Sequence, residues 1–360
     1  MQSAIMTVFD KVVTARGSPN IAFIKYWGKR DEKLILPCNS SLSMTLSSDT
    51  LNTTTSVLIS KKLEKDAFYI DGVLQDLQDP DVKERFEIVN KLRKMAKVKE
   101  KMLIVSKNNF PASSGMASSA SGIATLIYVL NAALELKLTQ RELSIIARQG
   151  SGSACRSVFG GIVVWKKGSN PDGTDSYAEQ IFDENYWAEL TDNIVIVTQE
   201  KKKVSSRAGM KQTVQTNPLY EMRYSSSETH IKEFVDAYKD KDFHRIADII
   251  IADSNEMHAL MLSTKPSIRY LNKASYAIMD AIEELNAKEG KNIAAYTFDA
   301  GANAHIITLA SNREKVMNAL KHLQDSKEII EIKSSKIGGA PFELNETESL
   351  IDMQSMSPYN

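Results

Sequence analysis

The first half of the chain alternates between short apolar stretches typical of strands and longer stretches with helical spacing. Strand-like stretches rich in Val, Ile, Thr and aromatic residues occur at 11–17, 21–27, 51–60, 68–76, 102–106 and 161–168. The fourth contains Asp71–Gly72, a hairpin signal. Apolar residues with helical spacing predict helices over 82–98 and 123–136.

The second half opens with a buried-strand pattern near residue 192 and is then mainly helical. Helical spacing occurs at 228–239, 242–262, 268–290 and 315–324, and strand patterns at 294–310, around a tight turn, and at 328–335. Because strands and helices do not follow a strict βαβ order, the pattern predicts an α+β fold rather than a doubly wound sheet. We expect the polar tail after residue 344 to be frayed.

Local signals mark several helix ends. Thr139 with Glu142, and Ser311 with Glu314, have the spacing of capping boxes and predict that helices begin there. Gly290 has the position of a C-terminal cap.

Length and composition limit the class of protein. The 360 residues favour two lobes, which we place at 1–190 and 191–360. Lys plus Arg and Asp plus Glu both number 45, so a broad nucleic-acid or membrane surface is not expected. The chain has only two cysteines, Cys38 and Cys155, and its first residues lack a secretory signal pattern. We therefore expect a cytoplasmic protein.

The stretch "NNFPASSGMASSASG" at 108–122 places small residues directly before the apolar helix at 123–136. Ser and Gly at a helix N-terminus allow backbone N–H groups to approach an anion, usually phosphate. The alternative is a loop with a small-residue packing face, and composition alone does not decide between them.

This stretch resembles the central phosphate-binding motif of the GHMP kinases, P-x-x-x-G-[small]-[small]-S-S-A. The matching residues are Pro111, Gly115, Ser118, Ser119 and Ala120, with Met116 where many members have Leu. The resemblance implies a two-lobed GHMP kinase fold, with a ribosomal protein S5 domain 2-like N-terminal lobe and an α+β C-terminal lobe. It also implies a site for ATP and Mg²⁺. The implied ATP-binding residues are Ser114, Gly115, Met116, Ala117, Ser118 and Ser119, and Ser119 or Ser118 reaches the metal or the transferred phosphoryl group.

A second stretch, "NIAFIKYWGK", begins at Asn20. If it is an edge strand, its Lys residues are simply solvated. It resembles the opening motif of the mevalonate diphosphate decarboxylases, N-I-A-x-I-K-Y-W-G-K. The resemblance implies that Lys25, Tyr26 and Lys29 work in the site and that Asn20 and Trp27 shape it.

The "GSGSACRS" turn and the "SSR" turn offer more anion contacts. The first has two interpretations. It is a surface turn with a solvated Arg, or Arg156 binds a carboxylate with two parallel hydrogen bonds. It matches the same family, which implies that Arg156 holds the substrate carboxylate and that Ser151 and Ser153 help the diphosphate. By the same resemblance, Ser206 and Arg207 contact the diphosphate. We interpret the neighbouring Cys155 as a buried filler.

"TFDAGANAH" places Asp299 in a turn after a strand, where an Asp often bonds its own backbone. The stretch resembles the family motif T-F-D-A-G-P-N-A, with Ala302 in place of Pro. The resemblance implies that Asp299 orients or deprotonates the tertiary hydroxyl of the substrate. We expect Lys29 to keep Asp299 ionised and His305 to be packed rather than catalytic.

Together these motifs imply one reaction and two small-molecule partners, ATP and mevalonate 5-diphosphate. The 3-hydroxyl is phosphorylated, phosphate leaves and CO₂ departs, giving isopentenyl diphosphate. Related alternatives are a mevalonate 5-phosphate decarboxylase and a mevalonate 3-kinase. A non-catalytic ligand-binding paralogue is a further alternative. A homodimer is usual in such enzymes, and we expect one here.

Overall fold

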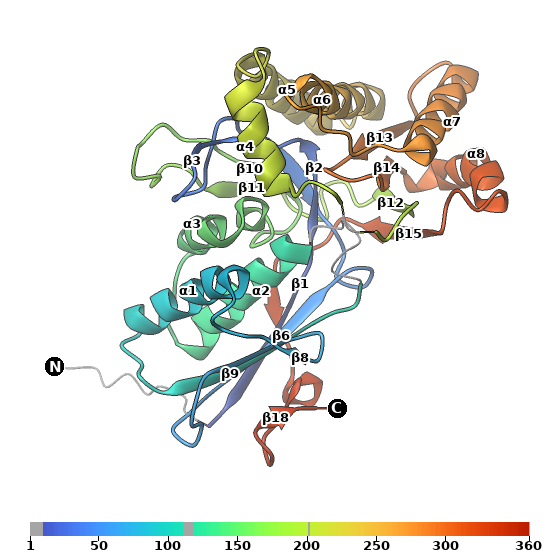
Figure 1. Ribbon diagram of the computed structural model, residues 1–360. Coiled ribbons are helices and arrows are strands. Elements are labelled where there is room, and N and C mark those ends of the chain that lie inside the picture. Colours follow the sequence, from blue (N-terminus) through green and yellow to red (C-terminus); the bar gives the residue numbers. More distant parts are fainter. Residues whose placement is uncertain (1–9, 111–117, 201, 360) are drawn as a thin grey trace.

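The computed structural model describes residues 10–110, 118–200 and 202–359, without the side chain of Ser118. The described residues form two α+β lobes that pack against each other (Figure 1). Among their helices, none has the length and hydropathy needed to cross a bilayer.

The sheet of the first lobe is covered on one face by three helices. Its order is β16 (Phe342–Glu343), β1 (Val12–Gly17), β6 (Thr53–Ser60), β9 (Lys101–Asn108), β7 (Ala67–Ile70) and β8 (Val73–Leu74). Only β7 and β9 pair in parallel among these strands. The helices are α1 (Pro80–Met95), α2 (Ser118–Ala133) and α3 (Gln140–Gly150), and Figure 1 shows them together on one side of β1 and β6. Alternate residues of β6 and β9 pack into their apolar core.

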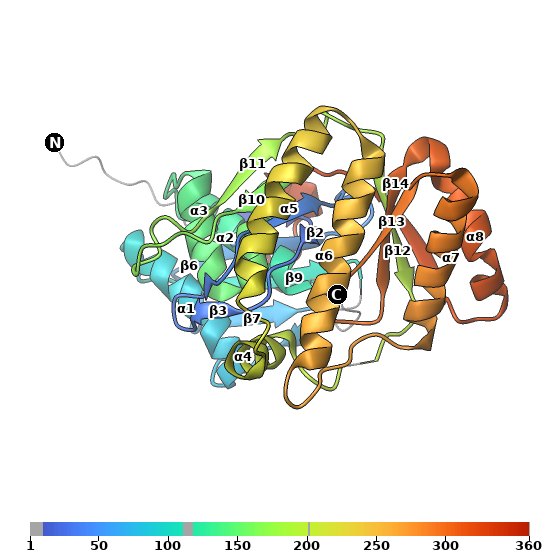
Figure 2. The ribbon, with the colours of Figure 1, turned by 90° about the horizontal axis from the view of Figure 1, so that it is seen from above.

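A middle sheet has apolar clusters on both of its faces. Its order is β11 (Ala178–Phe182), β10 (Ile162–Trp165), β5 (Ser41–Thr45) and β2 (Asn20–Ile24). Val163 and Trp165 pack with the helices of the first lobe, whereas Ile162 packs against α5 (Met222–Lys239) and α6 (Phe243–Ser263) of the second. Figure 2 shows α5 and α6 running side by side across this sheet. The middle sheet therefore joins the two lobes.

The sheet of the second lobe is also covered on both faces. Its order is β13 (Ala294–Phe298), β14 (Ala304–Leu309), β12 (Leu190–Ile196) and β15 (Glu331–Lys336). Helices α7 (Lys273–Glu289) and α8 (Arg313–Asp325) cover its outer face, and α6 lies on the inner face. The division into 1–190 and 191–360 stays a prediction.

The remaining elements are short or lie at the lobe boundary. They are α4 (Ser206–Thr216), the hairpin β3 (Lys29–Asp31) and β4 (Leu36–Pro37), the hairpin β17 (Ile351–Asp352) and β18 (Ser357–Pro358), and the 3₁₀ turns η1 (Gly152–Cys155), η2 (Ala310–Asn312) and η3 (Glu346–Glu348).

The polar tail is ordered, so the expectation of fraying is wrong. After β15 the chain returns to the first lobe, where β16 pairs with β1 (Figure 1). Ile351 is 1% exposed and packs against Leu58 and Leu103 on the sheet face opposite the three helices. Leu350 and Met356 pack beside it, so a few apolar residues together with backbone hydrogen bonds fix the polar segment.

The predicted helix-end signals had different outcomes. Thr139 and Glu142 form the reciprocal capping box, and Gly290 adopts the left-handed conformation at the end of α7. The predicted box at Ser311 is wrong, because η2 occupies that position and α8 begins at Arg313 without a side-chain cap.

Candidate active site

Lys25 and Asp299 meet at the boundary between the lobes. Lys25 follows β2, and Asp299 follows β13. The Lys25 Nζ lies 2.8 Å from Asp299 Oδ1, and the two side chains are 2% and 36% exposed. Burial raises the pKa of Asp299, but Lys25, His305 and Lys202 together bring that pKa below its ordinary value. Asp299 is therefore an ionised, partly accessible carboxylate at neutral pH.

The expectation that Lys29 partners Asp299 is wrong. Lys29 Nζ lies 2.6 Å from Glu32 Oε2. The chain turns at Gly28, whose φ is 105°, and then forms the β3–β4 hairpin, which carries Lys29 to Glu32. A Cβ at Gly28 would lie 1.8 Å from the Tyr220 hydroxyl, so only glycine fits this turn.

The strand predicted over 21–27 ends at Ile24 in the structure. The side chains of Tyr26 and Trp27, which follow it, have different partners. The Tyr26 ring packs on Trp165 with a centroid distance of 4.6 Å, and its buried hydroxyl has no partner among the described residues. Trp27 points elsewhere, and its Nε1 donates to Thr213 Oγ1 of α4 at 3.0 Å. Tyr26 thus leaves a free polar group, whereas Trp27 anchors the segment to the second lobe.

Arg156 is a buried cation held by neutral groups. It follows η1 and is 2% exposed. Its Nε donates to Asn20 Oδ1 at 3.2 Å and to Ser43 Oγ at 3.0 Å, and its Nη1 donates to Ser41 Oγ at 2.6 Å. No carboxylate lies within ion-pair distance of it in the described part of the chain. A buried guanidinium without a counter-ion favours an anionic ligand.

Asn20 fixes the Arg156 turn to β2. Its Nδ2 donates to the Ser153 carbonyl at 3.1 Å and to Ser157 Oγ at 2.7 Å, while its Oδ1 accepts from Arg156. Asn20 therefore orients both Arg156 and the Ser153 backbone.

Two of the predicted serines meet at the ends of helices. Ser119 Oγ, in the first turn of α2, lies 3.4 Å from Ser151 Oγ at the end of α3. Ser119 also lines a cavity of about 180 Å³ together with Ser106, Asn108 and Arg85. Predicted ATP-binding residues Ser114, Gly115, Met116 and Ala117 lie outside the described residues, as does the side chain of Ser118.

The turn that carries Asp299 is held from two sides, although Ala302 replaces the Pro of the motif. Ser275 Oγ donates to the Ala302 carbonyl at 2.8 Å. Asn303 Oδ1 accepts from the backbone N–H groups of Val197 and Thr198, at 2.9 and 3.1 Å. These contacts fix the turn without a proline ring.

Ser206 and Arg207 are the first two residues of α4, and Ser205 caps that helix. Arg207 Nη1 pairs with Glu84 Oε2 of α1 at 2.6 Å, and both side chains are about half exposed, at 53% and 46%. Ser206 Oγ accepts a hydrogen bond from Lys202 Nζ at 2.9 Å. Arg207 is thus directed at the first lobe rather than at Asp299.

Sequence reasoning missed two groups near Asp299. Lys202 Nζ also donates to the Ala300 carbonyl at 3.0 Å, and partial burial lowers the pKa of this lysine. The basic run at 201–203, just before a helix N-terminus, was the available signal. His258 of α6 is 7% exposed, and burial together with Lys25 lowers its pKa to about 4.

The remaining predictions concern buried groups. His305 is packed, as expected, with its Nδ1 2.6 Å from Asp192 Oδ2. Cys155 is a buried filler, and burial raises the pKa of its thiol to about 12, which leaves it a poor nucleophile.

Comparisons with known proteins agree along most of the chain. A model described as "Diphosphomevalonate decarboxylase-like N-terminal domain" matches residues 17–178, and one described as "Mevalonate 5-diphosphate decarboxylase C-terminal domain" matches residues 193–357. Diphosphomevalonate decarboxylase of Danio rerio is 41% identical over 321 residues, covering 87% of this chain and 80% of the relative.

Solved structures have the same fold. Mevalonate diphosphate decarboxylase from Trypanosoma brucei superposes with a TM-score of 0.86 at 34% identity, covering 95% of this chain and 100% of that one. A complex of MDDEF with MVAPP, AMPPCP and magnesium superposes with a TM-score of 0.82 at 36% identity, covering 93% and 99%.

Proposed function

Because the chain belongs to the diphosphomevalonate decarboxylase family, we propose that it catalyses ATP-dependent decarboxylation of mevalonate 5-diphosphate to isopentenyl diphosphate. The products are ADP, phosphate, CO₂ and isopentenyl diphosphate. One observation carries the proposal: the ionised Asp299, paired with Lys25, shares its site with Arg156, a buried cation without an ion-pair partner among the described residues.

The carboxylate and hydroxyl of the substrate fit this arrangement. Arg156 binds the carboxylate and thereby places the tertiary 3-hydroxyl at Asp299. Because Lys25 lowers the basicity of Asp299, the aspartate first accepts a hydrogen bond from the hydroxyl and aligns its oxygen. It takes the proton as the oxygen–phosphorus bond forms and ADP leaves.

The second half of the reaction needs no further base. The bond between C3 and the phosphorylated oxygen breaks, and phosphate leaves with the electron pair. The electrons of the bond to the carboxylate then form the double bond, and CO₂ departs. Arg156 holds the carboxylate in place until that bond breaks.

The nucleotide fits at the start of α2. Ser119 faces the cavity there, and the free N–H groups of a helix N-terminus favour phosphate. We propose that Ser119, or Ser118, contacts the metal. Bound Mg²⁺ supplies charge neutralisation to the phosphates during transfer.

The diphosphate needs the remaining polar groups of the site. Tyr26 has an unpartnered hydroxyl, and Ser151 and Ser153 are half-buried at the η1 turn. Ser206 and Arg207 complete the set, and Arg207 reaches this ligand only if it leaves Glu84.

Product stoichiometry tests the proposed function and separates it from its relatives. The protein is incubated with ATP and either mevalonate 5-diphosphate, mevalonate 5-phosphate or mevalonate, and ADP, phosphate and CO₂ are followed together. We expect equal amounts of all three with the diphosphate. ADP without CO₂ would indicate a 3-kinase, and CO₂ only from the monophosphate would indicate the other decarboxylase.

We also propose a cytoplasmic location and a homodimer. Cys38 and Cys155 are free and buried, which suits a reducing compartment. Fluorescence imaging of the tagged chain and sedimentation equilibrium test the two proposals separately.

A further inference from the structure

Arg223 of α5 and Asp253 of α6 form a completely buried ion pair. Arg223 Nη1 lies 2.7 Å from Asp253 Oδ2, and Nη2 lies 2.8 Å from Oδ1, so the pair is bidentate. Both side chains are 0% exposed. A buried ion pair is weak evidence for stability, because desolvation offsets much of the attraction. The role of the Arg223–Asp253 pair therefore follows from its contacts with other residues.

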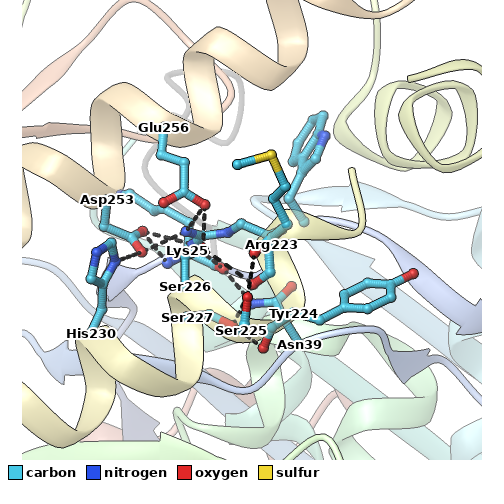
Figure 3. A network of polar contacts seen from close by, with 12 residues as sticks. Lys25, Asn39, Arg223, Tyr224, Ser225, Ser226, Ser227, His230, Asp253 and Glu256 are labelled. Atoms are coloured by element: carbon cyan, nitrogen blue, oxygen red, sulfur yellow. Dashed lines mark hydrogen bonds and ion pairs between the residues drawn. The ribbon is translucent and has the colours of Figure 1, made fainter. Parts of the chain in front are cut away.

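The side chains of Arg223 and Asp253 both hydrogen-bond to the backbone of one residue, Lys25. The Lys25 N–H donates to Asp253 Oδ1 at 2.8 Å, and Arg223 Nη2 donates to the Lys25 carbonyl at 3.0 Å (Figure 3). Asn39 Nδ2 donates to the same carbonyl at 2.9 Å. Lys25 lies just past β2, so no sheet ladder fixes its backbone. The side chains of the second lobe replace that ladder.

An outer ring of polar groups holds the pair in turn. His230 Nδ1 lies 3.0 Å from Asp253 Oδ2, and Glu256 Oε1 lies 3.0 Å from Arg223 Nη1. Ser226 Oγ donates to Glu256 Oε1 at 2.5 Å, and Figure 3 shows these residues converging around Lys25. The planar guanidinium and the carboxylate are thus fixed in orientation as well as in charge.

We propose that Arg223 and Asp253 are positioning residues that fix the Lys25 main chain so that its ammonium meets Asp299. This inference rests on the proposed function for its catalytic consequence. Lys25 Nζ has to hold Asp299 against the hydroxyl, and a small displacement in such a site costs much of the rate. The pair contacts the main chain of Lys25 and not its ammonium, so it acts on the Lys25–Asp299 contact through the Lys25 backbone.

The chain offers a matched control in the first lobe. Arg93 and Asp66 form another bidentate pair, with distances of 3.0 and 2.7 Å. Asp66 Oδ1 also accepts a backbone N–H, that of Met102, at 2.9 Å. The two pairs share chemistry and hydrogen-bond geometry, although Arg93 and Asp66 are 14% and 15% exposed, and only the Arg223–Asp253 pair holds a site residue.

The test compares Asp253→Asn with Asp66→Asn in the full chain. We expect Asp253→Asn to lower kcat at least tenfold with little change in the KM for ATP, whereas Asp66→Asn lowers the Tm and leaves kcat within twofold. Arg223→Lys is the second variant, because it keeps the charge but loses the nitrogen that donates to Lys25, and we expect the same loss of kcat. Equal kcat in Asp253→Asn, Arg223→Lys and Asp66→Asn would overturn the inference.

Crystal structures of the variants give a readout that does not need the reaction. We expect the Lys25–Asp299 contact to lengthen beyond hydrogen-bond distance in Arg223→Lys or Asp253→Asn and to persist in Asp66→Asn. An unchanged contact in both site variants would overturn the positioning role even if the wild-type protein proved inactive on mevalonate 5-diphosphate. Inactive wild-type protein with a broken contact would instead count against the proposed function alone.

Discussion

The Nζ of Lys25 lies 2.8 Å from Oδ1 of Asp299, and this contact joins the end of β2 to the turn after β13. The two residues are 274 positions apart in the chain. Each lobe therefore carries half of an ion pair that exists only when the lobes pack together, and the environment of the Asp299 carboxylate depends on that packing.

Replacing Asp299 by Asn removes the charge and the proton acceptor while keeping the shape. We expect kcat to fall about 10²- to 10⁴-fold, the usual range for a positioned acid or base. Binding of mevalonate 5-diphosphate, measured by calorimetry, should persist. Asp172→Asn, in an exposed turn, is the control. Near-normal turnover of Asp299→Asn would remove Asp299 from the mechanism.

Replacing Lys25 by Met should change the pH dependence of the reaction. Lys25 opposes the effect of burial on Asp299, so its loss raises the pKa of that carboxyl. Activity needs the ionised form and is lost as the pH falls through this pKa, so the acid limb of kcat/KM should move to higher pH.

Lys29→Met is the matched control for that measurement. Lys29 pairs with Glu32, so the acid limb should stay where it is in the wild-type protein, whatever happens to the rate. A shift of the limb in Lys29→Met but not in Lys25→Met would restore the assignment that the structure contradicts.

Replacing Arg156 by Leu should separate activity from stability. We expect kcat to fall roughly 10²- to 10³-fold, as for the loss of one charge-stabilising donor. Because no carboxylate is left unpaired among the described residues, the Tm should fall by less than about 4 °C. Thermal unfolding and steady-state kinetics on the same preparation measure both. A large fall in Tm with a normal rate would make Arg156 a structural residue.

Glu84→Gln should release Arg207. The pair is half exposed and contributes about 0.2–1 kcal/mol, so freeing Arg207 should lower the KM for mevalonate 5-diphosphate by at most about fivefold. The KM for ATP should not change. A higher KM for the diphosphate would mean that Glu84 orients Arg207 for binding instead of withholding it.

The sequence predicts the main elements, because the periodicity of apolar residues is set by burial. The site roles of Lys25, Arg156 and Asp299 come from the family resemblance and stay predictions, and the structure places Lys25 against Asp299. The prediction that Lys29 pairs with Asp299 is wrong, because the turn at Gly28 decides which lysine points inward and a strand pattern does not contain that turn.

Long-range contacts account for what the sequence could not predict. Arg223 and Asp253 lie 198 and 228 residues from Lys25 and belong to ordinary amphipathic helices. The segment just before the polar tail gave no strand signal, because pairing with β1 rather than its own composition makes β16. Lys202 was one of three lysines in a row, and only the fold shows which of its neighbours it meets.

The most direct test of the account is a crystal structure of this protein with mevalonate 5-diphosphate and a non-hydrolysable ATP analogue. We predict the 3-hydroxyl oxygen within hydrogen-bond distance of Asp299 while Lys25 still contacts that aspartate, and the substrate carboxylate on Arg156. A hydroxyl placed away from Asp299, or a carboxylate bound elsewhere with Arg156 unoccupied, would contradict it.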